Sequence, residues 1–361
     1  MIKQEINELK RLYTPSNCSI TRICGCYVDG EKNKKTEFKE AFLSLPEEEI
    51  FKYFELLRKT LSGSLGKNLL NLDFPLASEQ EGGTQAALLA LRDSKLKDDA
   101  LIEEFYDRVI NTYEYVGNYL ILLIHDAYDV PGKTTDGLTM DDASDTVFEY
   151  IMCCICPVNL SKPGLSYDNI NNEFHNRIRD WVVEMPETGF LFPSFNDRAT
   201  DIHSTLFYSK NPEEAHSEFV ENILGCTMPL SAGTQKEAFQ ALIEETLGDE
   251  VEYEVVKNIH ENLTEMIEEH KEIPEPLTLD KHQVKSLFEK SGVKEEKLTD
   301  FDKLYDAAAG EDTSLFVNNV ANVRTFEVKT PDVVVKVNPE RADLVNTLQI
   351  DGKRCLVIEI N

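Results

Sequence analysis

The sequence contains no apolar segment long enough to cross a membrane. A transmembrane helix takes about 20 consecutive apolar residues, whereas the run in residues 119–129 has only six apolar or aromatic residues before polar ones close it. The first ten residues, MIKQEINELK, contain no apolar core of the kind found in signal peptides. We therefore expect a cytoplasmic protein with no membrane partner.

Basic residues are also scarce relative to acidic ones. The chain has 37 Lys and Arg against 66 Asp and Glu, which gives a formal net charge of −29. This balance opposes non-specific binding to a phosphate backbone, because such binding depends on Lys and Arg that displace counterions. It suits a basic protein partner or cations, and it leaves room for a local basic patch.

Signatures of nucleotide-binding, dinucleotide-binding and common hydrolytic enzymes are missing. The sequence has no P-loop, no Rossmann glycine pattern, no His-Glu-x-x-His and no Gly-x-Ser-x-Gly. We therefore predict no cofactor, and whether the protein is an enzyme stays open. Eight cysteines are present, but a long chain without a secretion signal favours reduced thiols over disulfides.

The clearest structural signals in the sequence are two apolar runs, residues 119–129 and 147–158. Each is short and bounded by turn residues, which is typical of a strand buried on both faces. We expect them to be neighbours in the middle of one sheet, continued by strands at 177–185, 189–195 and 201–208. The short links between these later strands predict antiparallel pairing, because a parallel return needs a dozen or more residues.

The remaining segments complete an α+β prediction. Helices precede the sheet, residues 130–145 and 159–172 are predicted to be polar loops, and an acidic helical region precedes a small β-rich C-terminal tail. The dipeptide Asp351-Gly352 predicts a hairpin turn within that tail. We divide the chain into an α+β domain at residues 1–210 and a second region at residues 211–361.

Cysteines occur in two close pairs, Cys24 with Cys26 and Cys154 with Cys156. On a strand, residues two apart share a face, so two facing pairs could supply four thiolates to zinc. The spacing differs from the usual zinc knuckle. Since Cys is commonly buried, the pattern favours core thiols.

Polar side chains gather around one predicted hairpin turn and its following strand. Asp197, Asp201 and His203 lie there, and alternation along a strand would point Asp201 and His203 to the same face. Such a cluster could perform acid–base catalysis. Asp126, at the end of the first apolar strand, could join Asp201 and His203 as a metal ligand. Cross-strand ion pairs on an open sheet face are the structural alternative, and the pattern favours them.

The segment from residue 244 to residue 277 carries twelve acidic residues and two lysines, a net charge of −10. Helices of this charge could imitate a nucleic acid and bind a basic protein.

Two resemblances add to this interpretation. The stretches TRICGCYVDG (21–30), HDAYDVPGK (125–133) and CPVNLSKPG (156–164) resemble a bacterial family of similar length that is known only as a domain of unknown function. That resemblance covers essentially the whole chain and implies no activity. The order of elements, and above all the tail around residues 326–330 and 350–358, is similar to the bacterial nucleoid-associated protein family. This second resemblance implies nucleoid or nucleic-acid association and assigns no site residue.

Together these observations predict a cytoplasmic, non-enzymatic interaction protein, with nucleoid association as the role that the second resemblance implies. A metal-dependent hydrolase that uses Asp197, Asp201 and His203 is one alternative. An acidic nucleic-acid mimic is the other.

Overall fold

The structure is a computed structural model that describes residues 1–133, 139–248, 253–321, 326–329, 334–338, 341 and 344–359. Contacts divide the chain into two compact units, Met1–Pro229 and Leu230–Asn361. The division at residue 210 that the sequence suggested stays a prediction. A large antiparallel sheet combined with helices confirms the α+β class.

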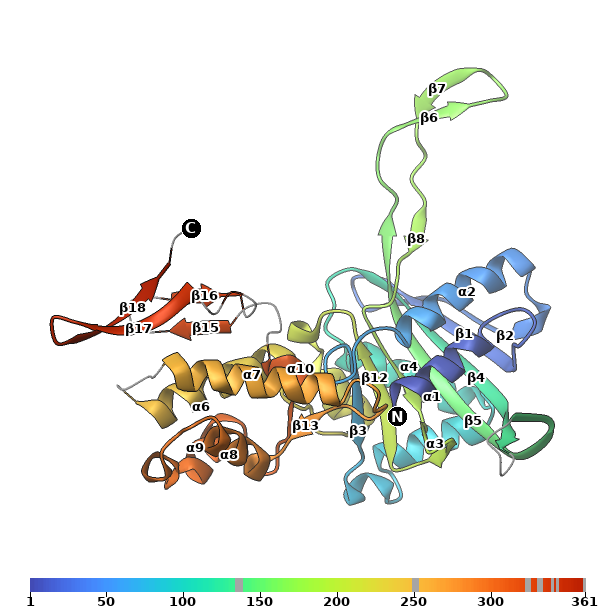
Figure 1. Cartoon of the computed structure of the whole chain (residues 1–361). Coiled ribbons are helices and arrows are strands. Elements are labelled where there is room, and N and C mark those ends of the chain that lie inside the picture. The colour runs from blue at the N-terminus through green and yellow to red at the C-terminus, as the bar shows by residue number, and fades with distance from the viewer. Residues whose placement is uncertain are drawn as a thin grey trace. The chain divides into compact units, whose positions relative to one another are not determined.

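The first unit is organised around one sheet whose main path runs β2-β1-β4-β5-β9-β12-β3 (Figure 1). Every neighbouring pair along this path is antiparallel. The strands are β1 (Ile20–Val28), β2 (Lys34–Ala41), β3 (Leu69–Asp73), β4 (Asn118–Lys133), β5 (Thr139–Leu160), β9 (Thr188–Phe192) and β12 (Ser204–Ser209).

The two apolar runs of the sequence form the central strands β4 and β5, as predicted. They pair directly, with Leu123 opposite Cys153, and they lie between β1 and β9. Because both strands have neighbours on each side and helices on each face, the side chains of Leu120–Ile124 and Tyr150–Cys156 are excluded from water, which explains the apolar sequence there.

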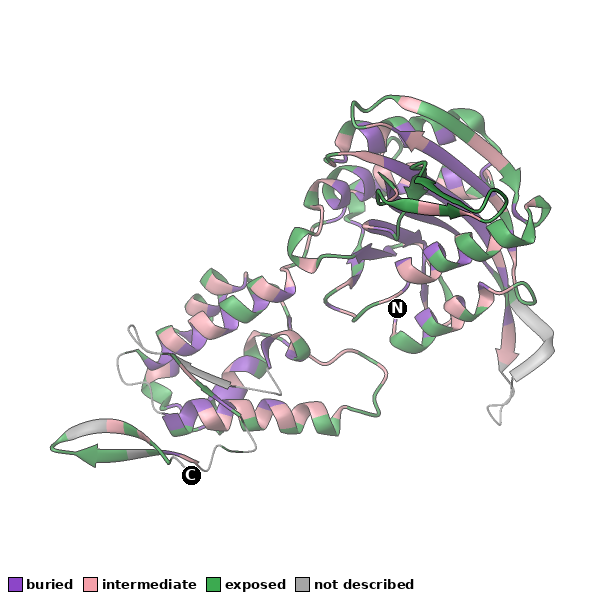
Figure 2. Ribbon diagram, turned by 90° about the horizontal axis from the view of Figure 1, so that it is seen from above, coloured by how far each residue is buried: buried purple, intermediate pink, exposed green. Residues whose placement is uncertain are grey.

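Helices cover both faces of this sheet (Figures 1 and 2). On one face, α3 (Thr84–Asp93), α4 (Asp99–Thr112) and a π-helical turn (Val220–Leu224) share a core with alternate residues of the strands. On the other face, α1 (Lys3–Leu12) and α2 (Glu47–Thr60) share a core with the intervening residues. The period of two along each strand thus feeds two separate hydrophobic layers.

The predicted loop at residues 130–145 is wrong where the structure describes it. β4 continues to Lys133 and β5 begins at Thr139. The register between the strands shifts on both sides of Pro131, so the proline, which lacks a backbone N–H, is accommodated at a bulge. Residues 134–138 lie outside the described part of the chain.

The predicted polar loop at 159–172 and the predicted strand at 177–185 are also wrong in part. β5 runs on to Leu160 and pairs with β8 (Trp181–Val183). Beyond that pair the chain forms a separate hairpin of β6 (Leu165–Asp168) and β7 (Glu173–Asn176). We call residues 160–185 the arm; Figure 1 shows it standing away from the sheet.

One edge of the sheet is strongly charged. Every residue of β2 is at least partly exposed, and two of its three lysines pair with acidic residues of α4. Lys34 contacts Glu103 and Asp107, while Lys39 contacts Asp99 at 2.9 Å. Charged edge strands of this kind discourage another strand from pairing with them.

The second unit has its own hydrophobic core, to which five helices and residues of three short strand pairs contribute within the described part of the chain. The helices are α6 (Ala232–Leu247), α7 (Tyr253–Glu269), α8 (Lys281–Lys290), α9 (Phe301–Ala308) and α10 (Val317–Val320). The strand pairs are β13 (Thr278–Leu279) with β14 (Leu315–Phe316), β15 (Phe326–Lys329) with β16 (Val334–Val337), and β17 (Val345–Ile350) with β18 (Lys353–Ile358). Asp351-Gly352 connects the last two strands, which confirms the predicted hairpin turn. No helix among the described residues is both long and apolar enough to cross a membrane.

Candidate functional site

The predicted catalytic residues lie on and beside a small hairpin formed by β10 (Ser194–Asn196) and β11 (Ala199–Asp201). Asp197 and Arg198 form its two-residue turn, and both have positive φ, 51° and 57°. This geometry fits a type I′ turn, whose twist matches the flanking strands and which Asp tolerates well. Asp197 is exposed at the tip of the turn.

Asp201 uses its carboxylate to hold the end of this hairpin. Its Oδ2 accepts hydrogen bonds from Asn196 at 2.6 Å and Ser204 at 2.8 Å, and its Oδ1 accepts from the His203 amide at 3.0 Å. Partial burial alone would raise the pKa of Asp201, but these hydrogen bonds lower it below its ordinary value. His203 is exposed, and its Nδ1 lies 2.6 Å from Glu79. The described contacts of Asp201 are therefore those of a turn-stabilising residue.

Asp126 lies elsewhere, fully buried on β4. The Tyr150 hydroxyl donates to its Oδ2 at 2.7 Å, and the hydroxyls of Tyr150 and Tyr13 are 2.9 Å apart. Burial raises the pKa of the Asp126 carboxyl, while the hydrogen bond from Tyr150 opposes that rise. The neighbouring His125 is also buried, pairs with Thr21 at 2.7 Å, and has its pKa lowered by burial to about 4, so it is neutral at pH 7.

Among the described residues, no group of three or more His, Cys, Asp and Glu side chains is placed to hold a metal ion. Roles for Asp126, Asp201 and His203 as ligands, and for Asp197 in catalysis, stay predictions. The positions of the cysteine pairs decide between a zinc site and core thiols. Cys24 and Cys26 belong to the core on one face of the sheet, whereas Cys154 and Cys156 belong to the core on the other. These four thiols cannot meet at one zinc ion, and they serve as core residues.

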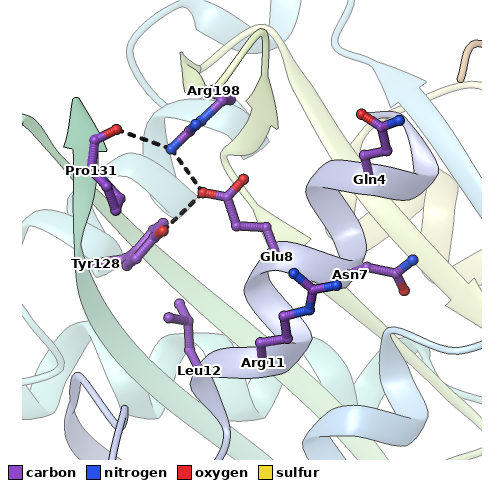
Figure 3. A pocket seen from close by; sticks show the side chains of 8 residues that line it. All are labelled: Gln4, Asn7, Glu8, Arg11, Leu12, Tyr128, Pro131 and Arg198. Atoms are coloured by element: carbon purple, nitrogen blue, oxygen red, sulfur yellow. Dashed lines mark hydrogen bonds and ion pairs between the residues drawn. The ribbon is translucent and has the colours of Figure 1, made fainter. Parts of the chain in front are cut away.

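A pocket of about 500 Å³ opens between α1, β4 and the hairpin turn (Figure 3). Glu8 is its central group, because one of its oxygens accepts from Arg198 at 3.0 Å and from the Tyr128 hydroxyl at 2.8 Å. Arg198 also donates to the Pro131 carbonyl at 3.1 Å, so the turn is fastened to both α1 and β4. The other side chains that line the pocket are Gln4, Asn7, Arg11 and Leu12.

The polar side chains of this pocket chiefly form hydrogen bonds with one another and with the backbone. Burial, and then the adjacent Glu8 carboxylate, raises the pKa of Tyr128, so the tyrosine stays protonated and donates to Glu8. The Arg198 guanidinium already donates hydrogen bonds to the Glu8 carboxylate and to the Pro131 carbonyl. We therefore assign the Glu8–Arg198–Tyr128 cluster a structural role that connects three segments far apart in the sequence.

The arm has a different character, because its hairpin has one apolar and one polar face. Tyr167 is paired with Phe174, and their ring centroids lie 5.2 Å apart. Leu165 lies two residues from Tyr167 and therefore on the same face, whereas Ser166 and its partner His175 point to the opposite face. We call Leu165, Tyr167 and Phe174 the tip face.

The tip face is open to solvent. Leu165 and Phe174 are 75% and 72% exposed, and the chain's single tryptophan, Trp181, is 56% exposed in the stem of the arm. Ten of the 21 large apolar side chains that are exposed among the described residues belong to the arm, which marks it as the main apolar surface there. They are Leu160, Leu165, Tyr167, Ile170, Phe174, Ile178, Trp181, Val182, Val183 and Met185. Figure 2 shows β6 and β7 largely in the colour of exposed residues.

Family comparison covers the entire chain. A model of the DUF4317 domain, a domain of unknown function, matches residues 1–361. The chain belongs to the DUF4317 family. This membership confirms the predicted resemblance to a domain of unknown function, whereas a relation to nucleoid-associated proteins stays a prediction. No curated protein matches the sequence.

Neither the Glu8–Arg198–Tyr128 cluster nor the arm was predicted from the sequence. The cluster joins residues up to 190 positions apart, and no local motif reports such a contact. The arm did leave a signal. Leu165 and Tyr167 alternate with polar residues, and Asn169, Asn171 and Asn172 supply turn chemistry before Phe174.

Proposed function

We propose that this DUF4317 protein is an interaction protein and that the arm is its docking element. The observation that carries the proposal is the uncovered tip face of Leu165, Tyr167 and Phe174. Two-stranded hairpins are marginally stable alone in water, and β6 and β7 pair only with each other among the described strands. A partner that covers the tip face would remove apolar surface from water and stabilise the hairpin.

Site-specific photo-crosslinking in cells tests this proposal. A photoreactive amino acid replaces Phe174 on the tip face in one variant and His175 on the opposite face in a matched control. We expect a crosslinked adduct from position 174 and little from position 175, because adjacent residues of a strand face opposite ways. If position 174 forms no adduct, or if both positions react equally, the arm is not the docking element.

A second candidate function is binding of a basic protein by the acidic helix α7. Glu254, Glu261, Glu265 and Glu268 are exposed along this helix, and their spacings of seven, four and three residues bring them to one side of it. Replacing all four with Gln keeps helix propensity while it removes four charges. Affinity capture that enriches basic proteins with the natural chain but not with the Gln variant would support this function; equal capture by both would exclude it.

Nucleoid association remains the role implied by the order of elements, and the net charge of −29 weighs against direct contact with a nucleic acid. A titration of DNA and RNA at low salt tests it directly. Absence of binding at low salt would remove nucleic acid from the possible partners.

A further inference from the structure

We infer that the partner of the arm is a second copy of this chain, whose arm packs against it by the tip face. This inference rests on the proposed function and specifies the partner for the same surface. Both arms would contribute the same residues around a twofold axis, as is usual for homodimers.

Charge favours an arm-to-arm contact over other contacts between two copies. The arm has three basic and four acidic residues, a net charge of −1, in a chain of net charge −29. Two such chains repel each other wherever their acidic bodies approach. Exposed charges separated by more than about 8 Å are largely screened at physiological ionic strength. A contact between two nearly neutral arms therefore avoids most of the repulsion.

The charges within the arm are also arranged for a twofold contact. Asp168 and Glu173 flank the turn at the end of the hairpin, while Arg177 and Arg179 follow β7 toward the stem. When two arms pack in opposite directions, the acidic end of each lies beside the basic segment of the other. A membrane surface lacks this complementarity, because anionic lipids would repel the acidic chain.

The arm also offers apolar surface for such a contact. An aromatic side chain buries roughly 150–250 Å² when it is fully covered, and the arm exposes Tyr167, Phe174 and Trp181 together with seven aliphatic side chains. Arms packed face to face would bury part of this apolar surface, with Leu165, Tyr167 and Phe174 of the tip face at the centre of the contact.

The purified full-length chain provides the test. Trp181 is the only tryptophan, so its fluorescence reports on the arm alone. We expect dimers in sedimentation equilibrium and a shift of Trp181 emission to shorter wavelength as the chain concentration rises. Phe174→Asp should raise the dimer dissociation constant at least about tenfold, as expected for a central contact residue. The adjacent His175→Asp, on the opposite face, should leave it within about twofold.

Other outcomes overturn the inference. A monomer at all concentrations with unchanged Trp181 emission excludes the second copy, and a dimer that tolerates Phe174→Asp forms through another surface. The in-cell crosslink separates this failure from failure of the proposed function. An adduct at position 174 of twice the 41.1 kDa chain supports the second copy. An adduct of another mass keeps the docking role but assigns it a different partner, and absence of any adduct rejects both.

Discussion

Tyr150 donates a 2.7 Å hydrogen bond to Oδ2 of Asp126, and both side chains are completely buried. They occupy the same face of the sheet as Tyr13, whose hydroxyl is the second partner of Tyr150. A carboxyl group in such surroundings is costly unless it is hydrogen-bonded or protonated. This buried network therefore gives the central sheet a stability that depends on pH.

Removing the Tyr150 hydroxyl should destabilise the protein. Tyr150→Phe leaves Asp126 Oδ2 without its donor, and an unsatisfied buried polar group costs about 1–3 kcal/mol. Tyr208→Phe is the matched control, because Tyr208 is equally buried but its hydroxyl has no hydrogen-bond partner among the described groups. Chemical denaturation at pH 7 measures both variants. Equal losses of unfolding free energy would contradict a special role for the Tyr150–Asp126 bond.

Asp126→Asn should stabilise the protein relative to the natural chain, and increasingly so as pH rises. Burial raises the pKa of Asp126 in the folded state, so the folded state binds a proton more tightly than the unfolded state does. Stability of the natural chain then falls as pH rises from the ordinary Asp pKa, about 3.9, to the raised folded value. Thermal melts of both chains between pH 4 and pH 8 measure the difference, and a difference that shrinks with rising pH would contradict this assignment.

Gly189→Ala should be strongly destabilising. A Cβ atom at this position would lie 2.3 Å from the Cys153 carbonyl oxygen and 2.9 Å from Thr60 Cγ2, and overpacking of a rigid core typically costs about 1–3 kcal/mol or more. Gly164→Ala is the control, because no atom lies within 4 Å of its added Cβ. Urea denaturation should show a large loss for the first variant and little change for the second.

Asp201→Ala should lower stability by about 1–2 kcal/mol, because Asn196, Ser204 and the His203 amide all lose their shared acceptor. Thr200→Ala, at an exposed neighbouring position, serves as the control. Calorimetric titration with Mg²⁺ on the same variants tests the predicted metal role. A loss of ion binding in Asp201→Ala that exceeds its loss of folded protein would favour the metal site over the turn.

Thiol alkylation should modify at most two cysteines in the native protein at pH 8 and all eight in denaturant. Six cysteines are buried, and only Cys18 and Cys355 are partly exposed. Burial also raises the pKa of Cys24 to about 11 and that of Cys26 to about 12, so few of these thiols are ionised. Mass spectrometry of peptides identifies the modified sites, and rapid native labelling of Cys154 would contradict the burial of that strand.

The sequence was most informative where the local pattern and the burial agree. The apolar runs at 119–129 and 147–158 predicted two neighbouring interior strands, and Leu123 opposite Cys153 confirms their pairing. The helices predicted before the sheet are also present, and one of them is α2, in which Phe54 and Leu57 are buried.

Prediction failed where long-range contacts override local signals. Pro131 and Gly132 predicted a loop, but β4 continues through both residues because it pairs with β5, with a bulge at Pro131. Asp201 and His203 share a stretch of sequence, yet Asp201 turns back to its own hairpin while His203 faces Glu79. The apolar residues of the arm were hidden by the polar residues between them, and only the pairing of β6 with β7 reveals a common face.

The charges of the edge strand β2 oppose self-association through the sheet. A third chain cannot extend the sheet by adding a strand there without stripping water from Lys34, Lys39 and their acidic partners. Growth into fibres needs an interface that repeats indefinitely, whereas an arm that packs on its own twofold mate is saturated at once. The arm and the edge together therefore favour a finite, closed pair over an open polymer.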